Sequence, residues 1–185
     1  MTEPLLEASG WARTTLSEAI VTAQTTLIVP VPEMSVPNPC RMWSPRPAAM
    51  APHVTVMFPF LAPCDLDEVT IDKLGLLFGT VRSFSFSMER TGTFGEVLWV
   101  APEPADAFRQ LTQMVQASWP SVAPYGGAFQ EVVPHVTIGQ ARFGRRPSRR
   151  LLARLPIEAT AREVKLLATL GRGWTEIGRF PFAET

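Results

Sequence analysis

Apolar and polar residues alternate along much of the chain with the period of two that marks a half-buried β-strand. The stretches with this pattern, or with a short β-branched apolar run, are 25–32, 53–60, 83–90, 93–102, 132–142, 160–170 and 173–182. Gly-containing turns separate 83–90 from 93–102 and 160–170 from 173–182, so each of these pairs is expected to form a hairpin.

Other stretches repeat their apolar residues at helical spacing. Residues 104–119 carry an apolar stripe typical of a helix, and Asp65 with Glu68 forms a capping-box pattern that predicts a helix through residue 79. Residues 1–24 show only a weak helical pattern and are expected to be an N-terminal extension to a domain spanning 25–185. The proline-rich segment 33–52 predicts a long loop.

Two of the predicted strands contain the same four residues, Pro-His-Val-Thr. They hold His53 and His135, the only histidines among 185 residues. In a strand, residues i and i+2 point to the same face. We therefore expect His53 to share a face with Thr55, and His135 with Thr137, while the valine between them packs on the other face. By chance, two histidines would both be followed by x-Thr only about once in 400 cases.

The paired motif suits acid–base chemistry at a phosphate. Two imidazoles with ordinary pKa values near ~6.5 supply one general base and one general acid at neutral pH. Two hydroxyls beside them would hydrogen-bond non-bridging phosphate oxygens. The histidines do not lie in a cluster with metal-ligand spacing, so we expect no metal and no other cofactor.

The composition limits the classes of partner. The 17 basic and 17 acidic residues balance, so no strong overall field draws the chain to nucleic acid or to a membrane. Only two cysteines are present, which does not make a disulfide framework. No apolar run approaches membrane-spanning length, and the N-terminus does not resemble a secretory signal. We expect a monomer in the cytoplasm without a membrane partner.

The motifs HVTV at 53–56 and HVTI at 135–138 resemble the paired signature of the 2H phosphoesterase superfamily, most closely its 2′,5′ RNA ligase-like branch. The resemblance covers about residues 25–183. It implies an α+β fold of two pseudo-symmetric lobes, with antiparallel sheets lining a central cleft and helices outside. It also implies a metal-independent phosphodiesterase acting on 2′,3′-cyclic phosphates or 2′,5′-phosphodiesters of RNA ends or nucleotides, in some members with ligase activity.

Within that resemblance, His53 and His135 become the acid–base pair, and Thr55 and Thr137 the phosphate-contacting hydroxyls. The sequence does not say which histidine is the base. The N-terminal extension and the proline-rich segment before the first motif depart from the family pattern. Two alternatives stay open: a non-catalytic module that binds a nucleotide or an RNA end, and a structural domain with vestigial motifs.

Two further residues are candidates for substrate binding. Tyr125, the only tyrosine, lies in the loop before the second motif, where its ring is placed to stack on a base or to anchor the loop. Arg142 begins an arginine-rich stretch through Arg154 that is either a track for phosphates or a solvated surface. Strand parity puts Arg142 opposite to His135 unless a bulge intervenes.

Overall fold

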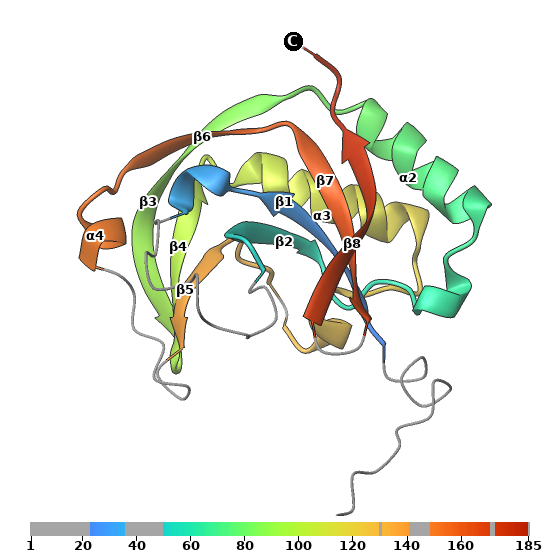
Figure 1. Ribbon diagram of the computed structural model, residues 1–185, viewed down its shortest axis with the longest axis horizontal. Coiled ribbons are helices and arrows are strands. Elements are labelled where there is room, and N and C mark those ends of the chain that lie inside the picture. The colour runs from blue at the N-terminus through green and yellow to red at the C-terminus, as the bar shows by residue number, and fades with distance from the viewer. Residues whose placement is uncertain (1–22, 36–49, 130, 141–148, 171–172, 185) are drawn as a thin grey trace, which may run out of the picture.

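The structure is a computed structural model that describes residues 23–35, 50–129, 131–140, 149–170 and 173–184 (Figure 1). The predicted N-terminal extension lies almost entirely outside these residues, as does most of the proline-rich segment. No helix within the described ranges is long and apolar enough to cross a membrane.

The strands form two antiparallel sheets of four strands each, in the orders β2-β1-β7-β8 and β5-β4-β3-β6. The first sheet consists of β1 (Thr25–Pro30), β2 (His53–Met57), β7 (Glu163–Leu170) and β8 (Gly173–Pro181). The second consists of β3 (Phe84–Phe94), β4 (Val97–Glu103), β5 (Val136–Gln140) and β6 (Ile157–Ala161). This is the α+β architecture with paired antiparallel sheets that the resemblance implied, and each sheet holds one of the two motifs.

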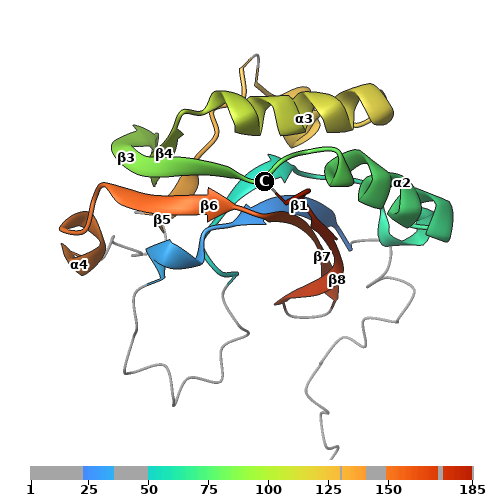
Figure 2. The ribbon, with the colours of Figure 1, turned by 90° about the horizontal axis from the view of Figure 1, so that it is seen from above.

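Three helices pack around the sheets in the described part of the chain. They are α2 (Glu68–Gly79), α3 (Asp106–Ser118) and the single turn α4 (Arg149–Leu152), with short 3-10 turns η1 (Pro32–Met34), η3 (Pro63–Asp65) and η4 (Pro124–Gly127). Helix α3 packs on β2 and α2 packs on β8. Figure 2 shows α3 above the strands and α2 at the right-hand end beside β1, while β7 and β8 curl below them.

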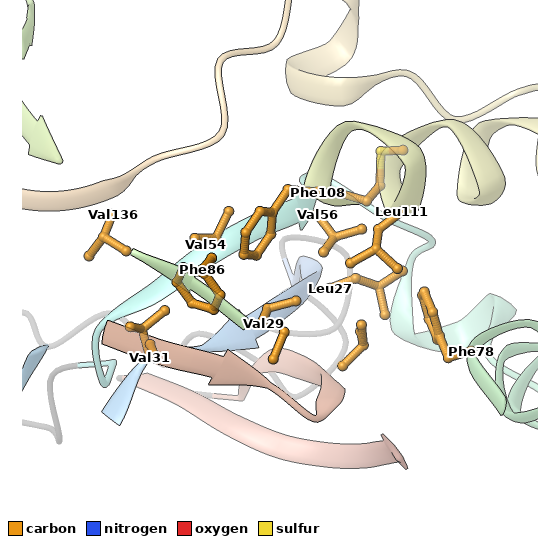
Figure 3. Close-up of a cluster of buried hydrophobic side chains, with 14 of the residues drawn as sticks. Leu27, Val29, Val31, Val54, Val56, Phe78, Phe86, Phe108, Leu111 and Val136 are labelled. Carbon is orange, nitrogen blue, oxygen red and sulfur yellow. The ribbon is translucent and has the colours of Figure 1, made fainter. Parts of the chain in front are cut away.

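The hydrophobic core lies between the helices and the sheets. The middle residues of both motifs contribute to it: Val54, Val56 and Val136 are each at most 2% exposed. In Figure 3, Val54 and Val56 point toward Phe108 of helix α3. The hydroxyl of Thr112, also on α3, donates a hydrogen bond of 2.9 Å to the carbonyl of Val56. The apolar alternation in the two motifs therefore anchors both strands to one core, as the pattern predicted.

The motif strands are neighbours in space. Strand β2 is at one edge of the first sheet, β5 is at one edge of the second, and these two edges contact each other. A proline precedes each histidine, which suits an edge strand because proline has no N–H to donate to a neighbour. The edge-to-edge contact of β2 and β5 brings the two histidine-bearing strands together.

Three sequence predictions need correction. The stretch 160–170 is not one strand: the chain leaves β6 in the second sheet and enters β7 in the first near Arg162. The cap of α2 is Asp67, whose carboxylate accepts from the N–H of Thr70 at 2.7 Å, because Asp65 lies in the preceding 3-10 turn. The turn of the first hairpin lies at Gly95 rather than between residues 90 and 93, because β3 continues to Phe94.

Candidate active site

The two histidines are held in the same way. The Nδ1–H of His53 donates a hydrogen bond to the carbonyl of Ala51, and the Nδ1–H of His135 donates to the carbonyl of Val133, each at 2.7 Å. In both cases the acceptor is the carbonyl two residues before the histidine. Because a carbonyl only accepts, Nδ1 must carry the hydrogen. The neutral imidazole then keeps its lone pair on Nε2, which is the nitrogen left for chemistry.

Both imidazoles are easier to deprotonate than a free histidine. Burial is the main cause that lowers the pKa of His53, and a positive charge on His135 lowers it further, while the hydrogen bond to Ala51 acts in the opposite direction. Burial likewise lowers the pKa of His135, against the effect of the hydrogen bond to Val133. Strands β2 and β5 contact each other, and the electrostatic effect of His135 on the pKa of His53 favours a pair that holds one proton rather than two.

Tyr125 belongs to the surroundings of His53, although it precedes the other motif in sequence. Its N–H donates to the carbonyl of Phe58 at 2.5 Å, which ties η4 to the end of β2. Burial raises the pKa of the Tyr125 phenol, and a hydrogen bond with the Thr55 side chain lowers it in part. Its φ of +52° is a left-handed conformation that non-glycine residues rarely adopt. The loop thus holds a strained backbone that presents the Tyr125 hydroxyl to Thr55.

The surroundings of His135 are aromatic. The ring centroid of Phe94 lies 5.2 Å from that of His135, and the ring of Trp99 lies 6.2 Å away. Trp99 is the direct cross-strand partner of Thr137, so the two side chains share a face of the second sheet. Sequence reasoning missed both aromatic residues. The sequence prediction put Phe94 and Trp99 in one strand, 93–102, whereas they lie on β3 and β4 on either side of the turn at Gly95. No sequence pattern indicated that β4 would pair with β5.

A network of charged side chains lies farther along the face that carries Thr55. Ile28 of β1 pairs with Thr55 on one side and with Lys165 on the other, which puts all three on one face. Lys165 forms ion pairs with Glu176 at 2.8 Å and with Glu163 at 3.5 Å. Arg179 contacts the same two glutamates at 2.8 and 3.6 Å. The two cations and two anions of this network compensate each other, so this part of the sheet carries little net charge.

The arginine-rich stretch divides between described and undescribed residues. Arg142 lies outside the described residues, so its proposed role is untested. Arg154 donates hydrogen bonds to the carbonyls of Glu33 at 2.8 Å and of Ser35 at 3.3 Å. These contacts fix the end of α4 to η1. Arg154 therefore has a role in packing, while Arg149 and Arg150 are exposed on α4.

Candidate metal ligands do not gather in the part of the chain that the structure describes. There, no group of three or more His, Cys, Asp or Glu side chains is placed to hold one ion. Cys64 is exposed, and Cys40 lies outside the described residues. The two motifs themselves supply two imidazoles and two threonine hydroxyls.

Solved structures with the same fold were found by comparison. The E. coli protein LigT, crystallised with NADP+, matches with a TM-score of 0.55 at 19% sequence identity, covering 86% of this chain and 97% of that chain. The protein TT0787 of Thermus thermophilus matches with a TM-score of 0.56 at 20% identity, covering 85% of this chain and 97% of that one. A crystal structure described as a phosphoesterase matches with a TM-score of 0.52 at 20% identity, covering 86% of this chain and 98% of that one. At such identities the likeness concerns the fold.

The family itself is shown by sequence. No curated protein sequence gives a significant match. The family model of the 2′-5′ RNA ligase superfamily, however, matches residues 41–173, which include both Pro-His-Val-Thr motifs. This match agrees with the two-sheet fold and with the resemblance to 2H phosphoesterases. The chain belongs to the 2′-5′ RNA ligase superfamily.

Proposed function

We propose that this protein is a metal-independent phosphodiesterase that opens 2′,3′-cyclic phosphates, or cleaves 2′,5′-phosphodiesters, of nucleotides or RNA ends. The observation that carries the proposal is the matched pair of imidazoles. Each has its Nδ1–H fixed on a backbone carbonyl, and the two lie on adjacent edge strands. Each histidine thus presents Nε2 in a defined orientation, which acid–base catalysis requires.

In the proposed reaction, the phosphate lies between the two Nε2 atoms. One neutral histidine removes a proton from water as the water oxygen attacks phosphorus. The other, protonated histidine gives its proton to the ribose oxygen as the phosphorus–oxygen bond breaks. The product is a nucleoside monophosphate, and the two histidines end with exchanged protons that solvent restores. A 2′,5′ linkage is cleaved by the same two proton transfers when the neighbouring 3′-hydroxyl attacks phosphorus in place of water. The 5′ oxygen leaves with a proton, the products are a 2′,3′-cyclic phosphate and a 5′-hydroxyl, and ligation is the reverse of this step.

The threonines and Tyr125 support the phosphate in this proposal. The hydroxyls of Thr55 and Thr137 donate hydrogen bonds to the non-bridging oxygens, whose negative charge grows in the transition state. Tyr125 orients Thr55 through the contact between their side chains. Thr137 is exposed on β5 and therefore accessible to a ligand, whereas Thr55 is half-buried. Arg142 remains a candidate for a second phosphate contact.

Neighbouring structures agree with a nucleotide substrate. LigT has been crystallised with 3′-AMP and with ATP. A nucleoside 3′-monophosphate is the product expected when a 2′,3′-cyclic phosphate opens at its 2′ oxygen. The compensated charges of Lys165, Arg179 and the two glutamates favour a small substrate over a long polyanion.

The experiment that tests the function is a turnover screen. Nucleoside 2′,3′-cyclic phosphates, ADP-ribose cyclic phosphate and 2′,5′-dinucleotides are incubated with the protein, and the position of the product phosphate is determined by NMR or chromatography. We expect turnover of at least one class, unchanged by EDTA. Loss of turnover with EDTA would contradict the mechanism. Nucleotide binding that is retained without any turnover would favour a non-catalytic binding module instead.

A further inference from the structure

An aromatic surface lies next to His135 and is not used by the acid–base mechanism. The ring of Phe94 stands nearly edge-on to the imidazole, at a centroid distance of 5.2 Å and an interplanar angle of 76°. On another side, Phe94 packs against Trp99 at 5.0 Å and 31°. The ring of Phe94 therefore packs on the indole of Trp99 and lies beside the imidazole of His135.

The β3–β4 hairpin builds this surface from its backbone register. Gly92 pairs with Trp99, and a Cβ on Gly92 would overlap the indole ring, so the indole occupies the space above that glycine. Phe94 follows Gly92 by two residues and shares its face of the strand. Gly95, with a φ of +54°, then turns the chain into β4. Because Trp99 pairs with Thr137, the aromatic surface is on the same face as the second motif.

Phe94 also stays accessible to a ligand. Its side chain is 44% exposed, which is unusual for a phenylalanine with a tryptophan and a histidine as neighbours. Two other aromatic side chains near the site, Tyr125 and Phe129, are placed differently. Tyr125 is half-buried, with its hydroxyl at Thr55, and its ring is in edge contact with Phe129. Phe129 is 62% exposed, but its ring contact is to Tyr125 rather than to a histidine.

We propose that Phe94, seated on Trp99, is the platform on which the nucleobase of the substrate stacks while its phosphate lies between the histidines. This inference rests on the proposed function, because the phosphate position is what brings the base toward the second sheet. Aromatic rings bind bases of any sequence by stacking. The platform therefore makes the enzyme selective for nucleoside phosphates over cyclic phosphates without a base, with little preference among bases.

The test compares two substrates that share the five-membered cyclic phosphate but differ in the base. Adenosine 2′,3′-cyclic phosphate carries the base, and glycerol 1,2-cyclic phosphate lacks it. We expect Phe94→Ala to lower kcat/KM for the adenosine substrate about 10-fold or more, through a higher KM. The kcat/KM for the glycerol substrate should not change. Phe94→Trp, which keeps an aromatic ring, should have the wild-type kcat/KM for the adenosine substrate. Leu76→Ala removes an exposed apolar side chain from the outer helix α2 and is the matched control.

Two results would overturn the platform. An equal loss on both substrates would mean that Phe94 acts by supporting His135 and not by binding a base. An unchanged KM of Phe94→Ala for the adenosine substrate would mean that the base binds elsewhere. Neither result would contradict the proposed phosphodiesterase function.

The failure of the proposed function is recognised separately. If the wild-type protein turns over neither substrate, calorimetry compares the binding of 3′-AMP with that of inorganic phosphate. The platform predicts that Phe94→Ala weakens 3′-AMP binding about 10-fold and leaves phosphate binding unchanged. Equal affinities of wild type and variant for 3′-AMP would exclude the platform.

Discussion

The two motif strands have the same four residues and the same histidine geometry, but their surroundings differ. In the first motif, the surroundings of Thr55 are polar: Tyr125 contacts Thr55, and Lys165 with its glutamates lies farther along the same face. At His135, the neighbours are the rings of Phe94 and Trp99. The repeated sequence thus determines how each imidazole is held. The sheet around it determines what else a substrate meets there, and we propose that the base lies on the aromatic side while the phosphate lies between the two histidines.

The largest expected effect comes from removing either imidazole. We expect His53→Ala and His135→Ala each to lower kcat by about 10²–10⁴-fold, because each supplies one of the two proton transfers. The double variant should be little worse than the more damaged single variant, since the two residues act as a unit. Single-turnover kinetics with a nucleoside 2′,3′-cyclic phosphate measure this. Strictly multiplicative losses in the double variant would argue against a shared reaction step.

The second prediction concerns only the aromatic surroundings of His135. In Gly92→Ala the new Cβ would overlap the Trp99 indole, so the ring must move away from its seat. We expect a loss of about 1–3 kcal/mol in the free energy of unfolding, measured by urea denaturation, together with a higher KM for nucleotide substrates. Gly75→Ala on α2 is the control, because a Cβ there meets nothing within 4 Å and alanine favours a helix. Equal stability of Gly92→Ala and wild type would refute the crowding.

The third prediction concerns only the polar surroundings of Thr55. Tyr125→Phe removes the hydroxyl that interacts with Thr55 but keeps the ring. We expect kcat/KM to fall by about 2–10-fold, the effect of one neutral hydrogen bond. Tyr125→Ala tests the ring itself. If Tyr125→Phe behaves as wild type while Tyr125→Ala loses nucleotide binding, then Tyr125 stacks on the base, and the division into a polar and an aromatic half is wrong.

The mildest probe of the comparison is pH. Because the pKa values of both histidines are lowered, the pair with one proton is most populated below about pH 6.5, so kcat/KM should follow a bell-shaped profile with its maximum on the acid side of that value. A maximum well above pH 7 would contradict these shifts.

The same shifts predict how stability depends on pH. The unfolded chain binds more protons than the folded one just below about pH 6.5, so the free energy of unfolding should fall as the pH drops through that value and should be insensitive to these groups above it. His53→Gln and His135→Gln should each flatten this dependence, because each variant removes one imidazole whose pKa is lowered by burial. Urea denaturation at a series of pH values measures the slopes, and a wild-type slope in both variants would contradict the lowered pKa values.

Local patterns predicted much of the secondary structure and the two motif faces. Both hairpins form, and the buried Val54, Val56 and Val136 confirm the alternation in the motifs. The errors occur where local patterns compete. The stretch 160–170 is continuously strand-like, but it crosses between two sheets near Arg162. The cap of α2 moves to Asp67 because a 3-10 turn takes up Asp65. Neither the crossing between sheets nor the shift of the helix cap alters the spacing of apolar residues, so the sequence pattern could not reveal them.

The sequence alone determined the chemistry offered by each motif, because the period of a strand places histidine and threonine on one face and valine on the other. It also indicated the family. The tertiary structure decided the rest: that the edge strands β2 and β5 lie together, that Tyr125 reaches Thr55 from a distant loop, and that Trp99 pairs with Thr137. These contacts depend on strand pairing between residues far apart in the chain. Such pairing is set by the packing of the whole core and leaves no mark in the local alternation of residues.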